Sequence, residues 1–136
     1  MNKESDIISA QKTRNRLIEH LEYACSEEKL LEYQNSVPIA QVPIELIEQW
    51  ADEFDMDGYV QGWYDNSAYT KEELQAALAF EAMINYACDN MPDDTCDIKE
   101  IFKMPWWSIF KKQAATTLSV FMKRGKLPND TEELNK

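Results

Sequence analysis

The apolar residues near the start of the chain recur with the period of an α-helix. From Glu4 to Cys25 they fall at spacings of three, four and seven positions, which places them on one stripe of an amphipathic helix. The stripe consists of Ile7, Ile8, Leu17, Ile18, Leu21, Ala24 and Cys25. The pattern predicts a first helix over this segment.

Local signals predict the next elements. Ser26 suits the N-cap of a continuation of the first helix or of a short second helix, which the polar residues before Pro38 interrupt. Pro43 suits the first turn of a third helix, where the missing N–H of proline costs nothing, and the apolar face of that helix extends to about Asp55. The segment from Asp57 to Tyr69 contains two of the three glycines and is predicted to be an ordered loop.

A long helix is predicted after this loop, over residues 71–90. Thr70 and Glu73 match a capping box, in which the threonine side chain accepts a backbone N–H and the glutamate reaches back to the cap. The sequence Pro92-Asp93-Asp94 is expected to end the helix.

The last third of the chain predicts a short helical piece and a final helix. The piece covers residues 97–103, and Pro105 suits the first turn of the helix that Gly125 can stop. Since consecutive helical positions point about 100° apart, one ring of Trp106-Trp107 is expected in the core and the other at its boundary. The expected core stripe is Trp107, Phe110, Ala114, Leu118 and Phe121.

These elements define the fold class as all-α. Glycine (3) and proline (5) are scarce, and 136 residues with 44% hydrophobic content suffice for one core without metals or disulfides. We therefore predict a single-domain bundle of about five helices over residues 1–136, with residues 1–3 and 129–136 frayed. Neither an apolar run of about 18 residues nor a signal-peptide pattern is present, which predicts a cytoplasmic protein.

The charge of the chain is negative and unevenly distributed. The formal net charge is −11, and residues 45–97 hold fourteen acids against one base, Lys71. Residues 98–136 carry eight bases and four acids, and we expect these bases to pair with the acidic middle across the fold. The overall field repels phosphate backbones and anionic membranes and attracts basic surfaces. The expected partner is a basic protein, with no direct nucleic-acid binding and no membrane binding.

Catalytic motifs are missing from the sequence. The single histidine, His20, lies within a predicted helix, and neither a nucleophile elbow nor a glycine-rich phosphate loop occurs. Cys25, Cys88 and Cys96 lack CxxC spacing and are interpreted as small, partly buried apolar residues. We predict a protein that is not an enzyme, with no catalytic residues and with neither a cofactor nor a metal.

One segment partly resembles a calcium-binding EF-hand loop. From Glu53 to Gly58 oxygen ligands alternate along the chain, but the twelfth position of the loop is Tyr64, where calcium needs a bidentate glutamate. The segment is therefore interpreted as the acidic end of a helix.

Acidic and aromatic side chains occur together in a single helix-loop segment. Carboxylates steer a basic partner, while Tyr and Trp supply contact area at a small cost in entropy. The alternative is that the aromatic residues pack the loop onto the core and the acids maintain solubility. The predicted partner-binding residues are Glu48, Asp52, Asp55, Asp57 and Asp65 as electrostatic contacts, with Tyr59, Trp63 and Tyr64 as anchors.

Small size, helical pattern, acidity and this segment together resemble the immunity proteins of bacterial toxin and immunity pairs, of the contact-dependent inhibition and colicin types. The resemblance is one of general character over most of the chain, and no family residue is transferred from it. It implies a cognate toxin, often a basic nuclease, that is blocked by a tight complex. The alternatives are a non-catalytic structural or adaptor protein of phage or plasmid origin and a DNA-mimic regulator.

Overall fold

A computed structural model describes residues 6–39, 41–91 and 97–132 of the chain. These residues form five long helices and two short ones, with no strand among them, which confirms the predicted all-α bundle. The long helices are α1 (Asp6–Ala24), α2 (Glu27–Ser36), α3 (Val42–Glu53), α5 (Lys71–Asn90) and α7 (Pro105–Phe121). The short helices are α4 (Met56–Val60) and α6 (Ile98–Phe102).

Local capping chemistry fixes where most helices begin. Thr70 and Glu73 form the predicted capping box at the start of α5, so two free N–H groups find acceptors. The predicted cap of α2 is also confirmed, because the Ser26 side chain accepts the N–H of Lys29 at 3.2 Å. Prolines lie in the first turns of α3 and α7, as predicted.

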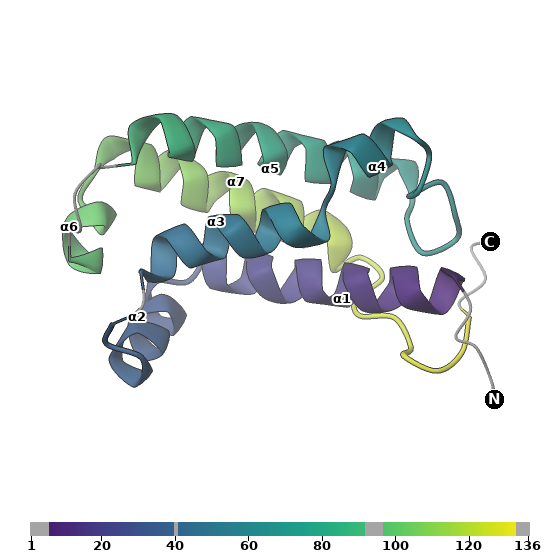
Figure 1. The fold of residues 1–136 in the computed structure, drawn as a ribbon, viewed down its shortest axis with the longest axis horizontal. Helices are drawn as coiled ribbons and strands as arrows, with labels where there is room; N and C mark the ends of the chain where they lie inside the picture. The colour runs from purple at the N-terminus through teal and green to yellow at the C-terminus, as the bar shows by residue number, and fades with distance from the viewer. Residues whose placement is uncertain (1–5, 40, 92–96, 133–136) are drawn as a thin grey trace.

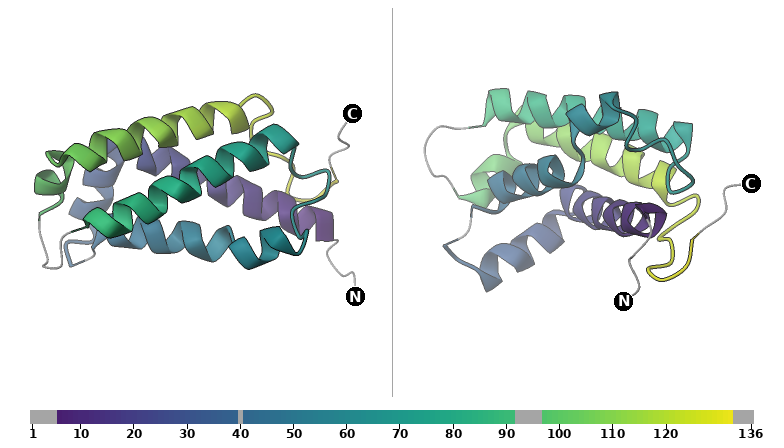
Figure 2. Two further views of the ribbon diagram at one scale, coloured as in Figure 1. Left: turned by 90° about the horizontal axis from the view of Figure 1, so that it is seen from above. Right: turned by 45° about the vertical axis from the view of Figure 1, so that its right-hand side comes forward.

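Four helices make up the body of the molecule. α1, α3, α5 and α7 run along its long axis, and α7 contacts both α5 and α1, while α3 contacts α1 (Figure 1). α2 projects from one end of this body, where α6 also lies, and α4 lies at the opposite end, beyond the last turn of α3 (Figure 2). The short α4 therefore lies at the end of the body where α5 begins and α7 ends (Figure 1).

Aromatic side chains fill much of the core. Trp50 of α3 packs edge-on against Phe80 of α5, with ring centroids 4.7 Å apart, and Phe80 lies 5.2 Å from Phe110 of α7. All three side chains are at most 1% exposed. Each buried side chain of this kind contributes roughly 1.5–3 kcal/mol to folding, so the aromatic contacts are a major part of what holds α3, α5 and α7 together.

The structure corrects several details of the predicted elements. Helix α3 ends at Glu53, and the first part of the expected loop is the helix α4. Trp106 and Trp107 are both buried, at 5% and 1% exposed, and both rings pack on Phe110 as well as edge to face on each other. Cys88 is exposed and so is not a core residue, while Cys96 lies outside the described residues.

The segment after α7 is attached to α1, at least as far as Thr131. Gln11 Nε2 donates hydrogen bonds to the carbonyl oxygens of Pro128 and Thr131, both at 2.8 Å. Asn15 exchanges hydrogen bonds with the backbone of Leu127 and also donates to Asn129 Oδ1. Residues 129 and 131 are thus hydrogen-bonded to α1, while the fraying expected over 129–136 stays a prediction. The expected fraying of 1–3 and the helix-ending Pro92-Asp93-Asp94 lie outside the described residues.

Candidate protein interaction surface

The residues predicted to bind a partner lie on α3, on α4 and its N-cap, and on the turns that follow α4. Their exposure divides them into three groups. Tyr59 is half-buried and Tyr64 is buried, at 8% exposed. The exposed members are Glu48, Asp52, Asp55, Asp57, Trp63 and Asp65.

Two of the acids share one face of α3. Glu48 and Asp52 are four residues apart within one helix and both are exposed, so their carboxylates project from the same side. Asp55 follows the end of α3 and is the N-cap of α4. Its Oδ1 accepts the N–H groups of Asp57 at 2.9 Å and Gly58 at 3.4 Å. These hydrogen bonds fix the position of the Asp55 carboxylate.

None of the five predicted contact acids takes part in a salt bridge within the described part of the chain. Ion pairs form elsewhere, for example between Lys123 and Glu72 at 2.9 Å and between Lys111 and Glu27 at 2.8 Å. The expected pairing with the acidic middle is thus confirmed for Lys123, and Arg124 likewise contacts Glu73. Glu53, at the end of α3, pairs with Arg16 at 2.8 Å, so it is the five predicted carboxylates that form no ion pair with a described residue.

Trp63 is the aromatic residue of this segment that offers its surface to solvent, at 58% exposed. The ring lies against Gly58 of α4, where an added Cβ would clash with it, because Trp63 Cδ2 would be 2.8 Å away. The Trp63 N–H also donates to the carbonyl oxygen of Gly58 at 2.9 Å. The turn reverses through Gly62, whose φ of 83° favours glycine. Trp63 is thus an exposed ring with a defined position.

Tyr64 does not belong to this surface, which corrects its predicted role as an anchor. Its ring stacks on Phe54 with centroids 4.9 Å apart, and its hydroxyl accepts the N–H of Asp55 at 2.8 Å and donates to the carbonyl oxygen of Glu53 at 3.3 Å. Tyr59 also packs toward Phe54, at 6.3 Å between centroids. For these two residues the structure matches the alternative interpretation, in which loop aromatics pack onto the core.

We call the exposed set the acidic-tryptophan surface. Its other exposed apolar residues on α4 are Met56, at 38% exposed, and Val60, at 80% exposed. It comprises Glu48, Asp52, Asp55, Asp57, Met56, Val60, Trp63 and Asp65.

A buried ionic cluster holds the loop beneath this surface, and the sequence pattern did not predict it. Glu73 contacts Arg14 of α1 at 2.8 Å and Arg124 at 2.7 Å. Arg124 also donates to the carbonyl oxygens of Ser67, at 3.3 Å, and Ala68, at 2.6 Å, in the turn before α5. The cluster thereby connects α1, the start of α5, the end of α7 and the loop.

The ionisation of Glu73 follows from its partners. Burial raises the pKa of its carboxyl, but hydrogen bonds from Arg124 and Arg14 outweigh burial and hold the pKa below the usual range. A carboxylate with two guanidinium partners is therefore charged at neutral pH, and it is not available as a proton donor.

Other candidate chemistry is limited in the described residues. No group of three or more His, Cys, Asp or Glu side chains among them could hold a metal ion, and Asp55 of the EF-hand-like segment caps α4. Within the same residues, no helix has the length and apolar character needed to cross a membrane. His20 is half-buried, and burial lowers the pKa of its imidazole, although Glu53 and Glu19 act in the opposite direction.

Comparisons with protein-family models, with curated proteins and with solved structures found no match to this chain. The geometry and charge of the acidic-tryptophan surface therefore carry the functional argument.

Proposed function

We propose that this chain is an immunity-type protein that binds and neutralises a basic bacterial toxin in the cytoplasm, with a nuclease as the leading candidate. The observation that carries the proposal is the acidic-tryptophan surface, in which five exposed carboxylates that form no ion pair with any described residue lie on the same helix-turn segment as an exposed tryptophan. This surface adds a specific structural feature to the general resemblance to immunity proteins.

The charge of this surface fits a partner that binds nucleic acid. A nuclease needs positive charge to hold phosphate groups, and carboxylates on an inhibitor can take the place of those phosphates. Complementary charge also speeds the encounter of the two proteins. Added salt weakens this attraction, because at 0.1 M exposed charges more than about 10 Å apart are largely screened. Association that slows as salt is added is therefore an expected property of the complex.

Trp63 supplies the affinity that charge alone does not. Interface energy concentrates in a few residues, and tryptophan is among the commonest of them. A ring already fixed against Gly58 loses little conformational freedom when a partner covers it. We expect Trp63→Ala to weaken binding by about 2 kcal/mol, which corresponds to roughly thirtyfold in affinity.

The test begins with capture of partners from a lysate of the source cell, at low and at moderate salt, followed by mass spectrometry. The proposal requires a stoichiometric basic partner whose toxicity or nuclease activity is abolished on binding. Recovery of the chain alone at low salt, or of a partner whose activity is unchanged in the complex, would move the assignment to a structural or adaptor role.

Variants locate the surface once the partner is known. Glu48→Lys with Asp52→Lys is expected to slow association about tenfold or more at low salt. The control is Asp89→Lys with Asp130→Lys, which changes the net charge equally at exposed acids outside the surface. Equal effects of the two pairs would show that net charge matters and that this surface does not.

A further inference from the structure

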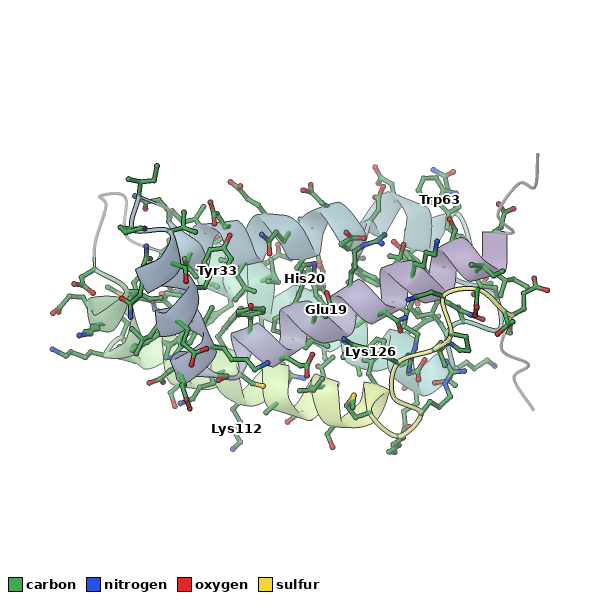
Figure 3. The ribbon with its side chains drawn as sticks, turned by 90° about the horizontal axis from the view of Figure 1, so that it is seen from below. Glu19, His20, Tyr33, Trp63, Lys112 and Lys126 are labelled. Atoms are coloured by element: carbon green, nitrogen blue, oxygen red, sulfur yellow. The ribbon has the colours of Figure 1, made fainter. Side chains whose placement is uncertain are left out.

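A pocket of about 180 Å³ lies between α1, α2 and α3. Glu19 and His20 of α1 and Tyr33 of α2 line it, and all three are visible from the same side of the molecule (Figure 3). Two further lining residues, Glu45 and Gln49, come from α3, the helix that also carries Glu48 and Asp52 of the acidic-tryptophan surface.

The volume limits what the pocket can hold. An engineered cavity of about 150 Å³ accommodates benzene, whereas sites for drug-sized ligands and cofactors occupy roughly 300–1,000 Å³. The pocket is therefore large enough for the head of one side chain and too small for a nucleotide cofactor. Leu30, Val42 and Leu46 supply apolar lining against which an alkyl stem can pack.

Carboxylates give the pocket a negative character. Glu45 is half-buried, and one of its oxygens accepts the Tyr33 hydroxyl at 3.2 Å. That hydrogen bond raises the pKa of the Tyr33 hydroxyl, so the tyrosine stays a neutral donor. Glu19 adds a second carboxylate and also pairs with the exposed Lys126 at 3.1 Å.

His20 contributes a polar atom that no described residue satisfies. Its Nε2 is buried and has no hydrogen-bond partner among the described residues. A neutral imidazole has one nitrogen that accepts a hydrogen bond. A buried polar atom without a partner costs free energy, but Nε2 has almost no accessible surface, so a ligand reaches it only if the imidazole turns toward the pocket.

Two aromatic rings in the lining favour a cation. Tyr23 and Tyr33 pack edge to face with centroids 6.1 Å apart. Tyr23 already attracts a cation in this structure, because Lys29 Nζ lies 5.7 Å from its centroid. The electron-rich faces of such rings attract ammonium and guanidinium groups, and the attraction grows as the cation loses water.

We propose that this pocket binds the guanidinium group of one arginine side chain presented by the basic partner. The inference rests on the proposed function and names one contact of the complex. Arginine fits better than lysine, because its planar head has five N–H donors in fixed directions and stacks on aromatic rings. Those donors suit carboxylate acceptors on two helices, Glu45 on α3 and Glu19 on α1.

The test uses N-acetyl-arginine methylamide as the probe and the imidazole signals of His20 as the reporter in NMR. The chain has one histidine, so those signals are assigned without mutagenesis. The arginine probe is expected to shift them in a saturable manner. The citrulline analogue has nearly the same shape without the charge and is expected to leave them unchanged. Equal shifts with both probes, or none with arginine at tens of millimolar, would overturn the proposal.

Substitutions separate the pocket from general acidity. Glu45→Gln is expected to weaken the probe about tenfold, because it removes the charge and keeps an oxygen that can accept the Tyr33 hydroxyl. Glu48→Gln makes the same change on the same helix outside the pocket lining and is expected to alter binding less than twofold. A comparable loss in both variants would assign the effect to the field of α3 and remove the pocket from the argument.

The same design distinguishes failure of the pocket from failure of the proposed function. Glu48→Lys with Asp52→Lys addresses the acidic-tryptophan surface, whereas the arginine probe requires no partner. A probe that fails in the wild-type chain overturns the pocket while the inhibitor proposal stands. A probe that binds while Glu45→Gln leaves the affinity for the captured partner unchanged shows that the pocket serves a free guanidinium compound, which also overturns the assignment to a partner's arginine.

Discussion

Arg14 and Glu73 form a salt bridge of 2.8 Å in which the side chains are 0% and 2% exposed. Arg14 also donates to the carbonyl oxygens of Phe121, at 3.0 Å, and Gly125, at 2.6 Å, at the end of α7. One side chain of α1 thus satisfies a carboxylate of α5 and two backbone acceptors at the end of α7. Such a cluster is sensitive to the loss of any single member, because the remaining charges stay buried.

The first prediction is that Glu73→Ala lowers the free energy of unfolding by about 3–5 kcal/mol. The substitution leaves Arg14 buried without its carboxylate and also removes half of the capping box with Thr70. Urea unfolding followed by circular dichroism measures the change.

The neighbouring residue supplies the control for this prediction. Glu72 pairs with Lys123 in an exposed salt bridge, with side chains 59% and 62% exposed. Exposed pairs contribute about 0–1 kcal/mol, so Glu72→Ala is expected to cost no more than that. If the two variants lose similar stability, the buried cluster has no special importance to the fold.

The second prediction concerns pH. Burial lowers the pKa of His20 below 6.5 in the folded chain, despite the opposing charges of Glu53 and Glu19 and with a contribution from Arg16 in the same direction. Between the folded pKa and 6.5 the unfolded chain binds more protons, so the stability contributed by neutral His20 is present above 6.5 and is lost as pH falls through the folded pKa.

Urea titrations between pH 7.5 and 5 measure this dependence. The wild-type chain is expected to lose stability across the range, and His20→Gln is expected to have a shallower slope because the titrating group is absent. An unchanged slope in the variant would assign the dependence to other groups.

The positions of the helices could be predicted because their determinants are local. The capping box of Thr70 and Glu73 and the proline at 105 specify where α5 and α7 begin, whatever packs against them. Tyr64 was placed on the surface because its burial depends on Phe54, which is ten residues earlier in the sequence, at the C-cap of α3. Pattern reasoning does not show which loop aromatics turn inward.

The buried cluster had a signal in the sequence that was not used. The apolar stripe of α1 has a gap between Ile8 and Leu17, and polar residues fill the positions of that stripe within the gap. Arg14 lies three, four and seven residues before Leu17, Ile18 and Leu21, so it faces the core with them. A polar residue at a core position predicts a buried partner. Only the tertiary structure shows that this partner is Glu73.

The third prediction concerns a buried hydroxyl. Tyr69 is 4% exposed, and its hydroxyl has no hydrogen-bond partner among the described residues. Its burial raises the pKa of the hydroxyl far above the usual range. Tyr69→Phe removes an unsatisfied polar group and keeps the ring that packs against Tyr64, so the free energy of unfolding is expected to rise by about 1 kcal/mol.

Tyr64→Phe is the matched comparison, because that hydroxyl makes two hydrogen bonds to the backbone. Its removal leaves the N–H of Asp55 without this acceptor and is expected to lower stability by about 1–2 kcal/mol. Opposite signs for the two tyrosines are the expected result in thermal or urea unfolding, and a loss of stability in both would show that the Tyr69 hydroxyl has a partner in solution.

The fourth prediction links Gly58 to the proposed interface. A Cβ at this position would meet the Trp63 ring, so Gly58→Ala is expected to displace the ring from α4. Alanine is roughly 1 kcal/mol better than glycine within a helix, which offsets part of the lost contact, so the global stability is expected to change little.

Trp63 is the exposed tryptophan, whereas Trp50, Trp106 and Trp107 are at most 5% exposed. Acrylamide quenching therefore reports mainly on Trp63, and a larger quenched fraction is expected in Gly58→Ala. The affinity for the basic partner should fall as well, because an unfixed ring must be ordered on binding.

Gly125→Ala is the control, since an added Cβ there meets no atom within 4 Å and any effect comes from its φ of 73° alone. A variant at Gly58 that binds as tightly as the wild-type chain, with Trp63 visibly displaced, would show that the partner does not use the ring in the position seen here.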